Sequence, residues 1–448
     1  MSQDDFLSSK KKTVEADAPN SLLMLIDVEA SPVVCLFFFA RLSLFCLQWV
    51  PSTMGNCLDS CLPEPITPDD RKKTEKNGEH IRFFMTGLGS AGKTTIVRQL
   101  FLLCNKVSNY KVCNENWVEE KTKPDDNEMW VATIRKNILD SIDIFIKQLK
   151  LNNDSFADDK DKQFAQYIEE VCEQGDEGIE DLEPTSDFID SLLKLFESEP
   201  IQNIWRKRNT INVEGKKLAD GCDQFINSKK IRECFSENYI ASDEDKVHSR
   251  KPTTDMSTYR FKINNMRIEI NDVGGQRSEL VKIVDYLSQW SFTEGDPRSN
   301  FILLVVSMSD FNVKHDEYEG TLLDECVEYM KVLLNNKVAQ NCGLFIFFNK
   351  KDRFKEKLLD PDCREDIQYL SPFLTPKQIA NFQRGRFNEQ EMQKALSDKF
   401  TEAIKTFKDR ERHSYCKYTC AVDSKMMEGI FSAIKEDVIN NQLMDILP

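Results

Sequence analysis

The sequence lacks the residue patterns that zinc sites and nucleic-acid surfaces need. Its 4 histidines are scattered, and none of its 14 cysteines forms a CxxC pair, so no zinc-binding spacing is present. Basic residues are in the minority, with 60 lysines and arginines against 75 aspartates and glutamates and a net charge of −15. Such a chain repels phosphate backbones, so we expect no nucleic-acid partner. We interpret the cysteines as reduced, mostly buried residues of a cytosolic protein.

Long apolar runs are also scarce, and the longest one carries a charge. Residues 33–50 are nearly all apolar, but Arg41 falls near the middle. At about 1.5 Å per residue, a helix of this length just crosses a thin bilayer. A central arginine costs roughly 2.5 to 3.5 kcal/mol on insertion, so a span would be marginal. Residues 1–53 are therefore either a marginal membrane segment or an extension of the reading frame.

The clearest motif present is a phosphate-binding loop. Residues 87–94 fit the pattern G-x-x-x-x-G-K-[ST], after an apolar stretch that predicts a strand at 81–85 and before helical periodicity at 95–103. The glycines allow backbone N–H groups to surround an anion, Lys93 can reach the β- and γ-phosphates, and Thr94 offers a hydroxyl to Mg²⁺. The predicted phosphate-binding residues are Gly87, Leu88, Gly89, Ser90, Ala91, Gly92, Lys93, Thr94, Thr95 and Gly275.

Later stretches predict the base and a metal ligand. A predicted strand at 266–271 leads to Asp272, whose carboxylate can hold a magnesium-bound water. Asp352 follows a predicted strand at 343–348, and its carboxylate can accept two N–H donors that guanine has and adenine lacks. A P-loop ATPase or kinase is disfavoured for that reason. The predicted guanine-binding residues are Asn349, Lys350, Asp352, Cys420 and Ala421.

In this order, the motifs resemble those of the α subunits of heterotrimeric G proteins, from about Ile81 to the C-terminus. The resemblance implies a mostly parallel, Ras-like α/β GTPase domain that is interrupted by an inserted all-helical domain. Residues 249–254 resemble the first switch of that family, which makes Arg250 a catalytic arginine and Thr253 a magnesium ligand. The second switch makes Gln276 the residue that orients the attacking water. The implied metal residues are Thr94, Thr253 and, through a bound water, Asp272.

The motif positions give expected domain boundaries. Helical periodicity at 130–146, 164–171 and 188–196 leads us to expect an insertion that is helical throughout. The expected segments are an N-terminal extension at 1–53, a lipidation motif with a short helix at 54–80, the first GTPase part at 81–109, the helical domain at 110–247, and the second GTPase part at 248–448.

The resemblance also implies a place at the cytoplasmic face of the plasma membrane. If Met54 is the start, Gly55 becomes a myristoylation site and Cys57 and Cys61 become palmitoylation sites. The implied partners are a G protein-coupled receptor at the last helix, 425–443, a βγ dimer, an effector and a GTPase-activating regulator. The implied ligands are Mg²⁺ and GTP or GDP.

Several residues depart from the family. Leu280 and Ile283 stand where arginine and tryptophan are usual, and prolines confine the N-terminal helix to 69–79, which weakens the inference of a βγ partner. Ser90 stands where the family usually has a glutamate that pairs with the first-switch arginine, here Arg250. The alternative function is a nucleotide-bound scaffold that does not turn over.

Overall fold

The computed structural model describes residues 80–121, 126–213, 218–251, 253, 256–275, 282–291, 299–314, 319–408, 410 and 413–444. The predictions for Gly55, Cys57, Gln276, Leu280 and the helix at 69–79 lie outside these residues. No helix within the described ranges is long and apolar enough to cross a membrane.

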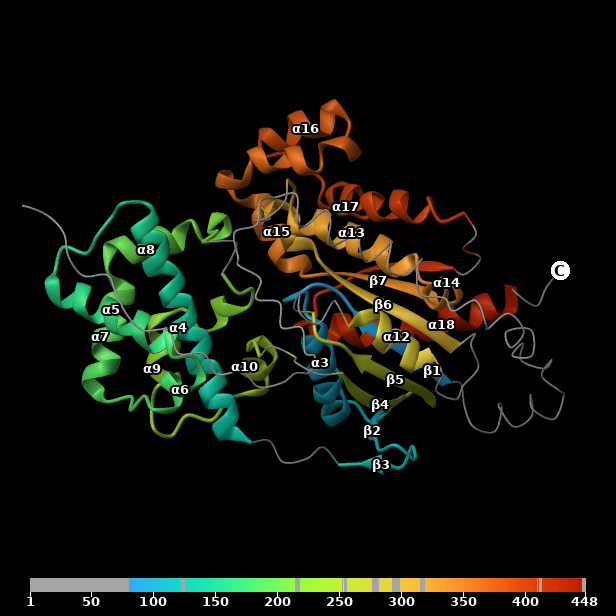
Figure 1. The fold of residues 1–448 in the computed structure, drawn as a ribbon, viewed down its shortest axis with the longest axis horizontal. Coiled ribbons are helices and arrows are strands. Elements are labelled where there is room, and N and C mark those ends of the chain that lie inside the picture. The colour runs from blue at the N-terminus through green and yellow to red at the C-terminus, as the bar shows by residue number, and fades with distance from the viewer. Residues whose placement is uncertain are drawn as a thin grey trace, which may run out of the picture. The chain divides into compact units, whose positions relative to one another are not determined.

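An eight-stranded, mostly parallel sheet forms the centre of the fold, as expected (Figure 1), with strand order β3-β2-β4-β5-β1-β6-β7-β8. Strand β1 lies parallel to both β5 and β6, and β6, β7 and β8 continue the parallel pairing, whereas β2 and β4 run antiparallel to their neighbours. The strands are β1 (His80–Thr86), β2 (Tyr110–Cys113), β3 (Glu119–Glu120), β4 (Ser257–Ile263), β5 (Met266–Asp272), β6 (Asn300–Ser307), β7 (Gly343–Asn349) and β8 (Ser414–Tyr418).

Alternating side chains of the central strands enter two different cores. In β1, Phe83 joins the core under helices α3 (Lys93–Lys106) and α18 (Ser424–Met444), while Phe84 joins the core on the opposite face. Every residue of β6 and β7 is buried, as the continuous apolar runs predict for strands covered on both sides. The helices of the Phe84 face are α12 (Ile283–Ser291), α13 (Leu322–Leu334), α14 (Lys337–Asn341), α15 (Lys351–Leu359), α16 (Pro376–Gln383) and α17 (Glu389–Ile404).

The charged segment between 361 and 399 contributes to this second core. It forms three 3-10 turns, η5 (Pro361–Cys363), η6 (Glu365–Tyr369) and η7 (Ser371–Phe373), followed by α16 and most of α17. Phe400, near the end of α17, packs its ring 5.3 Å from that of Phe348 in β7. Residues of the segment itself are also buried in this core, so the segment covers part of this face of the sheet: Ile367, Leu370, Phe382, Met392 and Leu396.

A second, helical unit has a core of its own. Helix α4 starts after Asp126, whose carboxylate accepts from the N–H of Met129, and it buries Ile134, Ile138 and Ile142 at helical spacing. The unit contains α4 (Asn127–Leu151), α5 (Asp159–Glu173), α6 (Asp176–Glu180), α7 (Ser186–Glu197), α8 (Glu199–Arg206), η1 (Arg208–Thr210), η2 (Cys222–Gln224) and α9 (Ser228–Cys234), and the short α10 (Asp243–His248) follows it.

The expectation that the chain is helical from Tyr110 onward is wrong at the start of the segment. Strand β2 pairs with β4, and β3 pairs with β2, so both extend the sheet. Tyr110 is buried in the core under α3 and α18, and its hydroxyl donates to the backbone oxygen of Glu428. A four-residue strand with one alternation carries too little periodicity to be recognised in the sequence.

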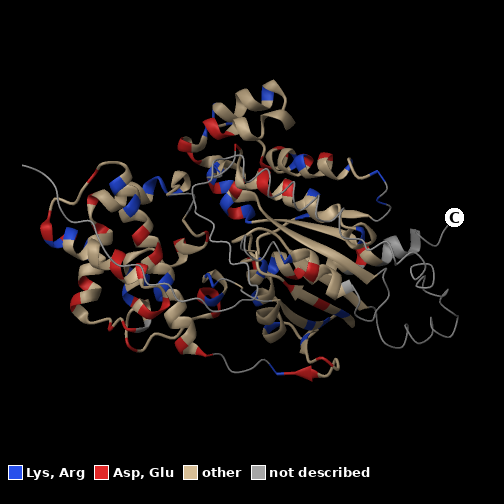
Figure 2. Cartoon of the chain, in the orientation of Figure 1, with Lys and Arg blue, Asp and Glu red and all other residues tan. Residues whose placement is uncertain are grey.

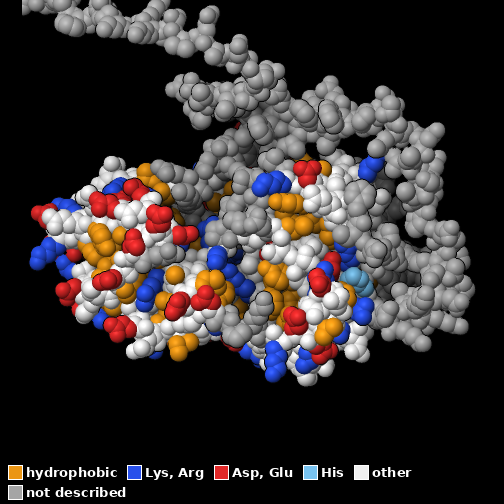
Figure 3. All heavy atoms as spheres, turned by 60° about the horizontal axis from the view of Figure 1, so that its bottom comes forward, with side chains coloured by type: hydrophobic (Ala, Val, Ile, Leu, Met, Phe, Trp, Pro, Cys, Tyr) orange, Lys and Arg blue, Asp and Glu red, His pale blue; other side chains and the backbone are white. Residues whose placement is uncertain are grey.

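Both units carry acidic and basic side chains (Figure 2). The segment between 154 and 199 is predominantly acidic, with 16 aspartates and glutamates against 3 lysines. On the face shown in Figure 3, hydrophobic side chains are scattered among charged ones. Most of the described cysteines are buried, and none of those described is in a disulfide, in line with the expected role as core residues.

Candidate nucleotide-binding site

The loop between β1 and α3 has the geometry of an anion cradle. Gly87 adopts a φ of 142°, and a Cβ there would lie 2.2 Å from the backbone oxygen of Val305. Gly92 adopts a φ of 100° immediately before α3, where a Cβ would lie 2.3 Å from the amide nitrogen of Asn349. Both positions therefore require glycine, for conformation and for space. The loop delivers the N-terminus of α3, with its unpaired N–H groups, to the site.

Lys93 lies inside this loop. Its Nζ donates to the backbone oxygens of Gly87, at 2.8 Å, and Leu88, at 3.2 Å. Burial lowers the pKa of Lys93 to about 8, partly opposed by the carboxylate of Asp272. A Cβ on Gly275 would lie 2.1 Å from Nζ, so a side chain at this position would displace the lysine. An anionic phosphate beside Nζ would stabilise its charged form.

A cluster of oxygen groups lies beside the first turn of α3. The Thr94 hydroxyl donates to Asp272 Oδ2 at 3.0 Å and lies 2.6 Å from the hydroxyl of Thr253. Within the described residues, Asp272 Oδ1 is buried without a hydrogen-bond partner. Burial raises the pKa of Asp272 to about 6, against the opposing charge of Lys93. Hard oxygen groups, including an unsatisfied carboxylate oxygen, suit Mg²⁺, so the residues present fit this ion.

The opposite end of the site is built around Asn349, where β7 ends. Its Oδ1 accepts from the N–H of Ala421, at 2.9 Å, and from the hydroxyl of Thr419, while its Nδ2 donates to the backbone oxygen of Ala91 at 2.9 Å. One buried amide thus joins the β7 loop, the β8 loop and the phosphate loop. This geometry gives Asn349 a supporting role for the loops around the base.

Asp352 lies in the first turn of α15. The residue before this helix, Lys350, has a left-handed backbone conformation with a φ of 62°. Asp352, Cys420 and Ala421 line one cavity together with Gly92 and Thr95 of the phosphate loop and helix. Burial raises the pKa of the Cys420 thiol to about 12, and the charge of Asp352 acts in the same direction. The acidic side chain that was predicted to select guanine therefore faces the same cavity as the loop of Ala421.

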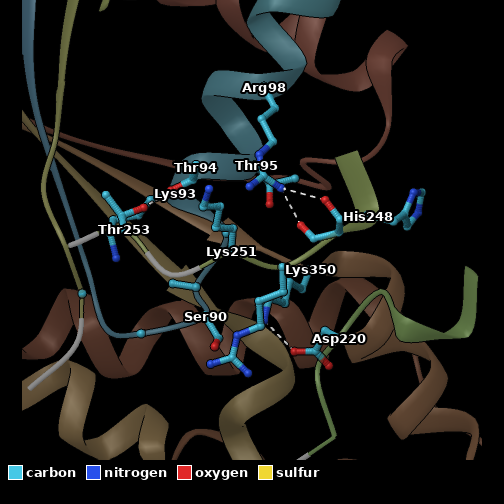
Figure 4. Close-up of a pocket in the computed structure, with 16 residues that line it drawn as sticks. Ser90, Lys93, Thr94, Thr95, Arg98, Asp220, His248, Lys251, Thr253 and Lys350 are labelled. Atoms are coloured by element: carbon cyan, nitrogen blue, oxygen red, sulfur yellow. Dashed lines mark hydrogen bonds and ion pairs between the residues drawn. The ribbon is translucent and has the colours of Figure 1, made fainter. Parts of the chain in front are cut away.

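A second cavity adjoins the first at the phosphate loop. It is lined on one side by the phosphate loop and on the other by a wall formed by residue 220 and by residues between 248 and 253 (Figure 4). In that wall, Asp220 Oδ2 accepts from Lys350 Nζ at 2.5 Å, and Arg98 of α3 donates to the backbone oxygen of Ser249 at 2.5 Å. The wall residues are Asp220, His248, Ser249, Arg250, Lys251 and Thr253.

Comparison with known proteins identifies the family. The family model for the G-protein alpha subunit matches residues 63–438. The chain belongs to the G-protein alpha subunit family. It is therefore a GTP-binding signalling protein of a GTPase family.

The curated relatives are distant but nearly full length. The G(o) subunit alpha of Lymnaea stagnalis is 24% identical over 367 residues, which cover 81% of this chain and 89% of the relative. The G(o) subunit alpha of Planorbella trivolvis is 23% identical over the same shares. The alpha-1 subunit of Caenorhabditis elegans is 24% identical over 380 residues, covering 84% of this chain and 92% of the relative.

In this G-protein alpha subunit, the predicted site residues within the described ranges converge. Lys93, Thr94, Thr253, Gly275 and Arg250 line one cavity, Asp352, Cys420 and Ala421 line the other, and Gly92, Thr95 and Lys350 line both. Asp272 contacts Thr94, and Asn349 lines the cavity of Asp352 and hydrogen-bonds to Ala91 and Ala421.

Sequence reasoning did not identify Arg98, Asn137, Asp220 or Arg353, which contact these elements from the surrounding structure. None of them belongs to a contiguous motif. The sequence offers a local signal for Arg98, which lies four residues after Thr94 in the phosphate-loop helix, but this spacing indicates only a polar helix face.

Proposed function

We propose that this protein is the α subunit of a heterotrimeric G protein, a switch that hydrolyses GTP and passes a signal from a membrane receptor to effectors. The observation that carries the proposal is the convergence of a phosphate loop, an oxygen cluster suited to Mg²⁺ and an acidic guanine-selecting residue on two adjoining cavities. The family membership supports the same function.

The phosphate end would perform the hydrolysis. Thr94 and Thr253, with Asp272 acting through a water, would hold Mg²⁺, which would supply positive charge beside the β- and γ-phosphates. Lys93 exchanges its bonds to the loop carbonyls for phosphate oxygens. Arg250 contacts the charge that develops in the transition state, and Gln276 orients the attacking water.

The guanine end would select the nucleotide. Asp352 accepts the two N–H donors of the guanine edge, and the N–H of Ala421 donates to the guanine oxygen. The N–H of Ala421 already donates to the side chain of Asn349 at 2.9 Å. On binding, this N–H would donate to both acceptors or would exchange Asn349 for the guanine oxygen.

The C-terminal helix would carry the receptor signal. Helix α18 begins three residues after Ala421, and Ser424 at its first turn accepts a side-chain hydrogen bond from Gln99 of the phosphate-loop helix. A receptor that shifts α18 would therefore shift both ends of the nucleotide site. The departure from the family at Ile283 supports weaker βγ coupling, because this first residue of α12 is buried in the core on the Phe84 face and offers almost no surface contact.

Membrane attachment is proposed through Gly55 and Cys57, at the cytoplasmic face of the plasma membrane. The test is the intact mass of the endogenous protein. A chain that begins at Gly55 and carries an acyl group supports this part of the proposal. A chain that keeps residues 1–53 and behaves as an integral membrane protein contradicts it, and Gly55→Ala should release the protein only in the first case.

The central test is a GTP turnover assay beside a measurement of bound GDP. Gln276→Leu is expected to keep GTP binding and lose hydrolysis, because it removes the amide that orients the water and leaves the phosphate loop intact. Arg250→Cys should behave likewise, since it removes only a transition-state contact. Stoichiometric nucleotide binding without turnover in the unmodified protein would instead favour the scaffold function.

A further inference from the structure

We propose that Asn137 of helix α4 is a positioning residue for Arg250, and that it acts in hydrolysis by fixing the peptide from which the arginine side chain extends. The proposal rests on the role in hydrolysis that is proposed above for Arg250. It assigns a function in the reaction to a side chain of the helical unit.

Two hydrogen bonds join Asn137 to the backbone of this one residue. The N–H of Arg250 donates to Asn137 Oδ1 at 2.6 Å, and Asn137 Nδ2 donates to the backbone oxygen of Arg250 at 2.9 Å. A single amide therefore satisfies both the donor and the acceptor of Arg250. The paired bonds fix the direction of the residue, because rotation of either adjoining peptide would break one of them.

The preceding residue is held from the other side. Ser249 is almost fully buried, and its backbone oxygen accepts from Arg98 Nη1 at 2.5 Å, while the same nitrogen donates to the oxygen of Lys246 at 3.2 Å. Figure 4 shows Arg98 extending from α3 toward this segment. The guanidinium of Arg98 also lies over the ring of Trp130 in α4, 4.9 Å from its centroid. The 249–250 backbone thus lies between the phosphate-loop helix and α4.

Asn137 is suited to this task because α4 is rigidly anchored at that point. Ile134 and Ile138, on either side of it in the sequence, are completely buried in the helical core. The Ser141 hydroxyl, one turn later, donates to the backbone oxygen of Asn137 at 2.7 Å. The Asn137 amide is therefore presented from a fixed helix, and Arg250, which lines the phosphate cavity, extends from a backbone that these bonds hold.

The expected effect follows from the entropy of that backbone. Without the amide, Arg250 must be ordered again in each transition state, and the cost of fixing one residue corresponds to a roughly five- to thirtyfold slower hydrolysis step. Binding of GTP or GDP should change little, because Arg250 contacts charge that develops only in the transition state.

The test is single-turnover GTP hydrolysis by the full chain. Asn137→Ala should hydrolyse roughly five- to thirtyfold more slowly with GTP affinity unchanged. Gln148→Ala is a matched control, since Gln148 is an amide on the same helix that donates to Asn152 at its C-terminal end, and it should hydrolyse at the unmodified rate. If Asn137→Ala does not fold, as judged by GDP stoichiometry, Asn137→Asp supplies the measurement, because it keeps an acceptor for Arg250 N–H and replaces the donor to the Arg250 backbone oxygen with a carboxylate oxygen that repels it. Asn137→Asp should likewise slow hydrolysis, and an unchanged rate would overturn the proposal.

The deciding comparison combines the two positions. In an Arg250→Cys background, Asn137→Ala should cause no further loss, because the side chain that it positions is already absent. A loss of the same size in both backgrounds would show that Asn137 acts elsewhere and would overturn the proposal, as would unchanged hydrolysis in the single variant. Normal turnover by Arg250→Cys alone would refute the role of the arginine itself, so the two failures can be told apart.

Discussion

Release of GDP is expected to depend on Arg353, which follows the guanine-selecting Asp352 on α15. Its guanidinium pairs with Asp223 and Glu356, and its Nε lies 3.6 Å from Asp220 Oδ1. Asp223 lies in the 3-10 turn η2, and Asp220 lies two residues before that turn, on the other side of the cavity. These contacts join the two sides of the cavity, so we expect them to separate when a nucleotide leaves.

The structure sets the size of the effect. Arg353 is 8% exposed, so its pairs exceed the roughly 0.2 to 1 kcal/mol of exposed ion pairs. Its removal leaves Asp220 with Lys350 Nζ at 2.5 Å and Asp223 with Arg208 Nε at 3.3 Å, so the loss stays below the roughly 3 to 5 kcal/mol of an orphaned buried charge. We expect about 1 to 2 kcal/mol on the release barrier, or roughly five- to thirtyfold faster release.

Arg353→Met is the suitable variant because it keeps an apolar stem of similar length. Dissociation of a fluorescent GDP, chased with unlabelled GDP, measures the rate. Arg364→Met is the matched control, since Arg364 donates to the backbone oxygens of Leu358 and Leu359 on its own side of the cavity. Release that is unchanged in Arg353→Met, or accelerated equally in both variants, would refute the reasoning.

Three further predictions concern single carboxylates and one loop residue. Asp352→Asn should shift binding from guanine toward xanthine nucleotides in a competition assay, since an amide can donate to the oxygen that replaces the guanine amine; equal loss of both would leave Asp352 as loop support. Ser90→Glu should slow fluorescent GDP release roughly two- to tenfold, and only while Arg250 is present, because the two residues line one cavity and could then pair. Burial alone raises the pKa of Asp245, but hydrogen bonds from Lys230 and other partners lower it to about 2. The contribution of Asp245 to the stability of the folded protein is therefore complete above the unfolded pKa of about 4 and is lost as pH falls toward 2. Asp245→Asn should therefore flatten the acid dependence of unfolding between about pH 4 and pH 2, and an unaltered slope would contradict this.

The elements that the sequence predicts correctly are those whose signals are local. Strand β1, its glycine loop and α3 are contiguous, and the left-handed φ values at Gly87 and Gly92 explain why glycine is required there. The continuous apolar runs of β6 and β7 likewise predict buried central strands. Residues that follow such strands meet at one edge of a parallel sheet, which is why Asp272 and Asn349 could be assigned to one site.

The residues that sequence reasoning missed depend on contacts between distant segments. Asn137 precedes Arg250 by more than a hundred residues, and in the sequence it is one polar residue in an amphipathic helix. Asn349 belongs to a recognisable motif, but its bonds to Ala91 and Ala421 indicate support of three loops, a role that no spacing encodes. Periodicity predicts which face a residue occupies, whereas the partner on that face is determined by tertiary packing.

The contacts of Arg353 change what the presence of Ser90, in place of the family's usual glutamate, implies for nucleotide release. From the sequence, a serine in the phosphate loop removes an ion pair with Arg250 and should loosen the closure of the chain around the nucleotide. In the structure, Arg353, Lys350 and their acidic partners connect the two walls at the guanine end, and Arg208 adds a pair to Glu356 at 2.6 Å. We therefore expect closure at the base to compensate for the missing contact at the phosphates. The release rate should consequently respond more strongly to Arg353→Met than to Ser90→Glu, and the reverse order would place the principal closure at the phosphate loop.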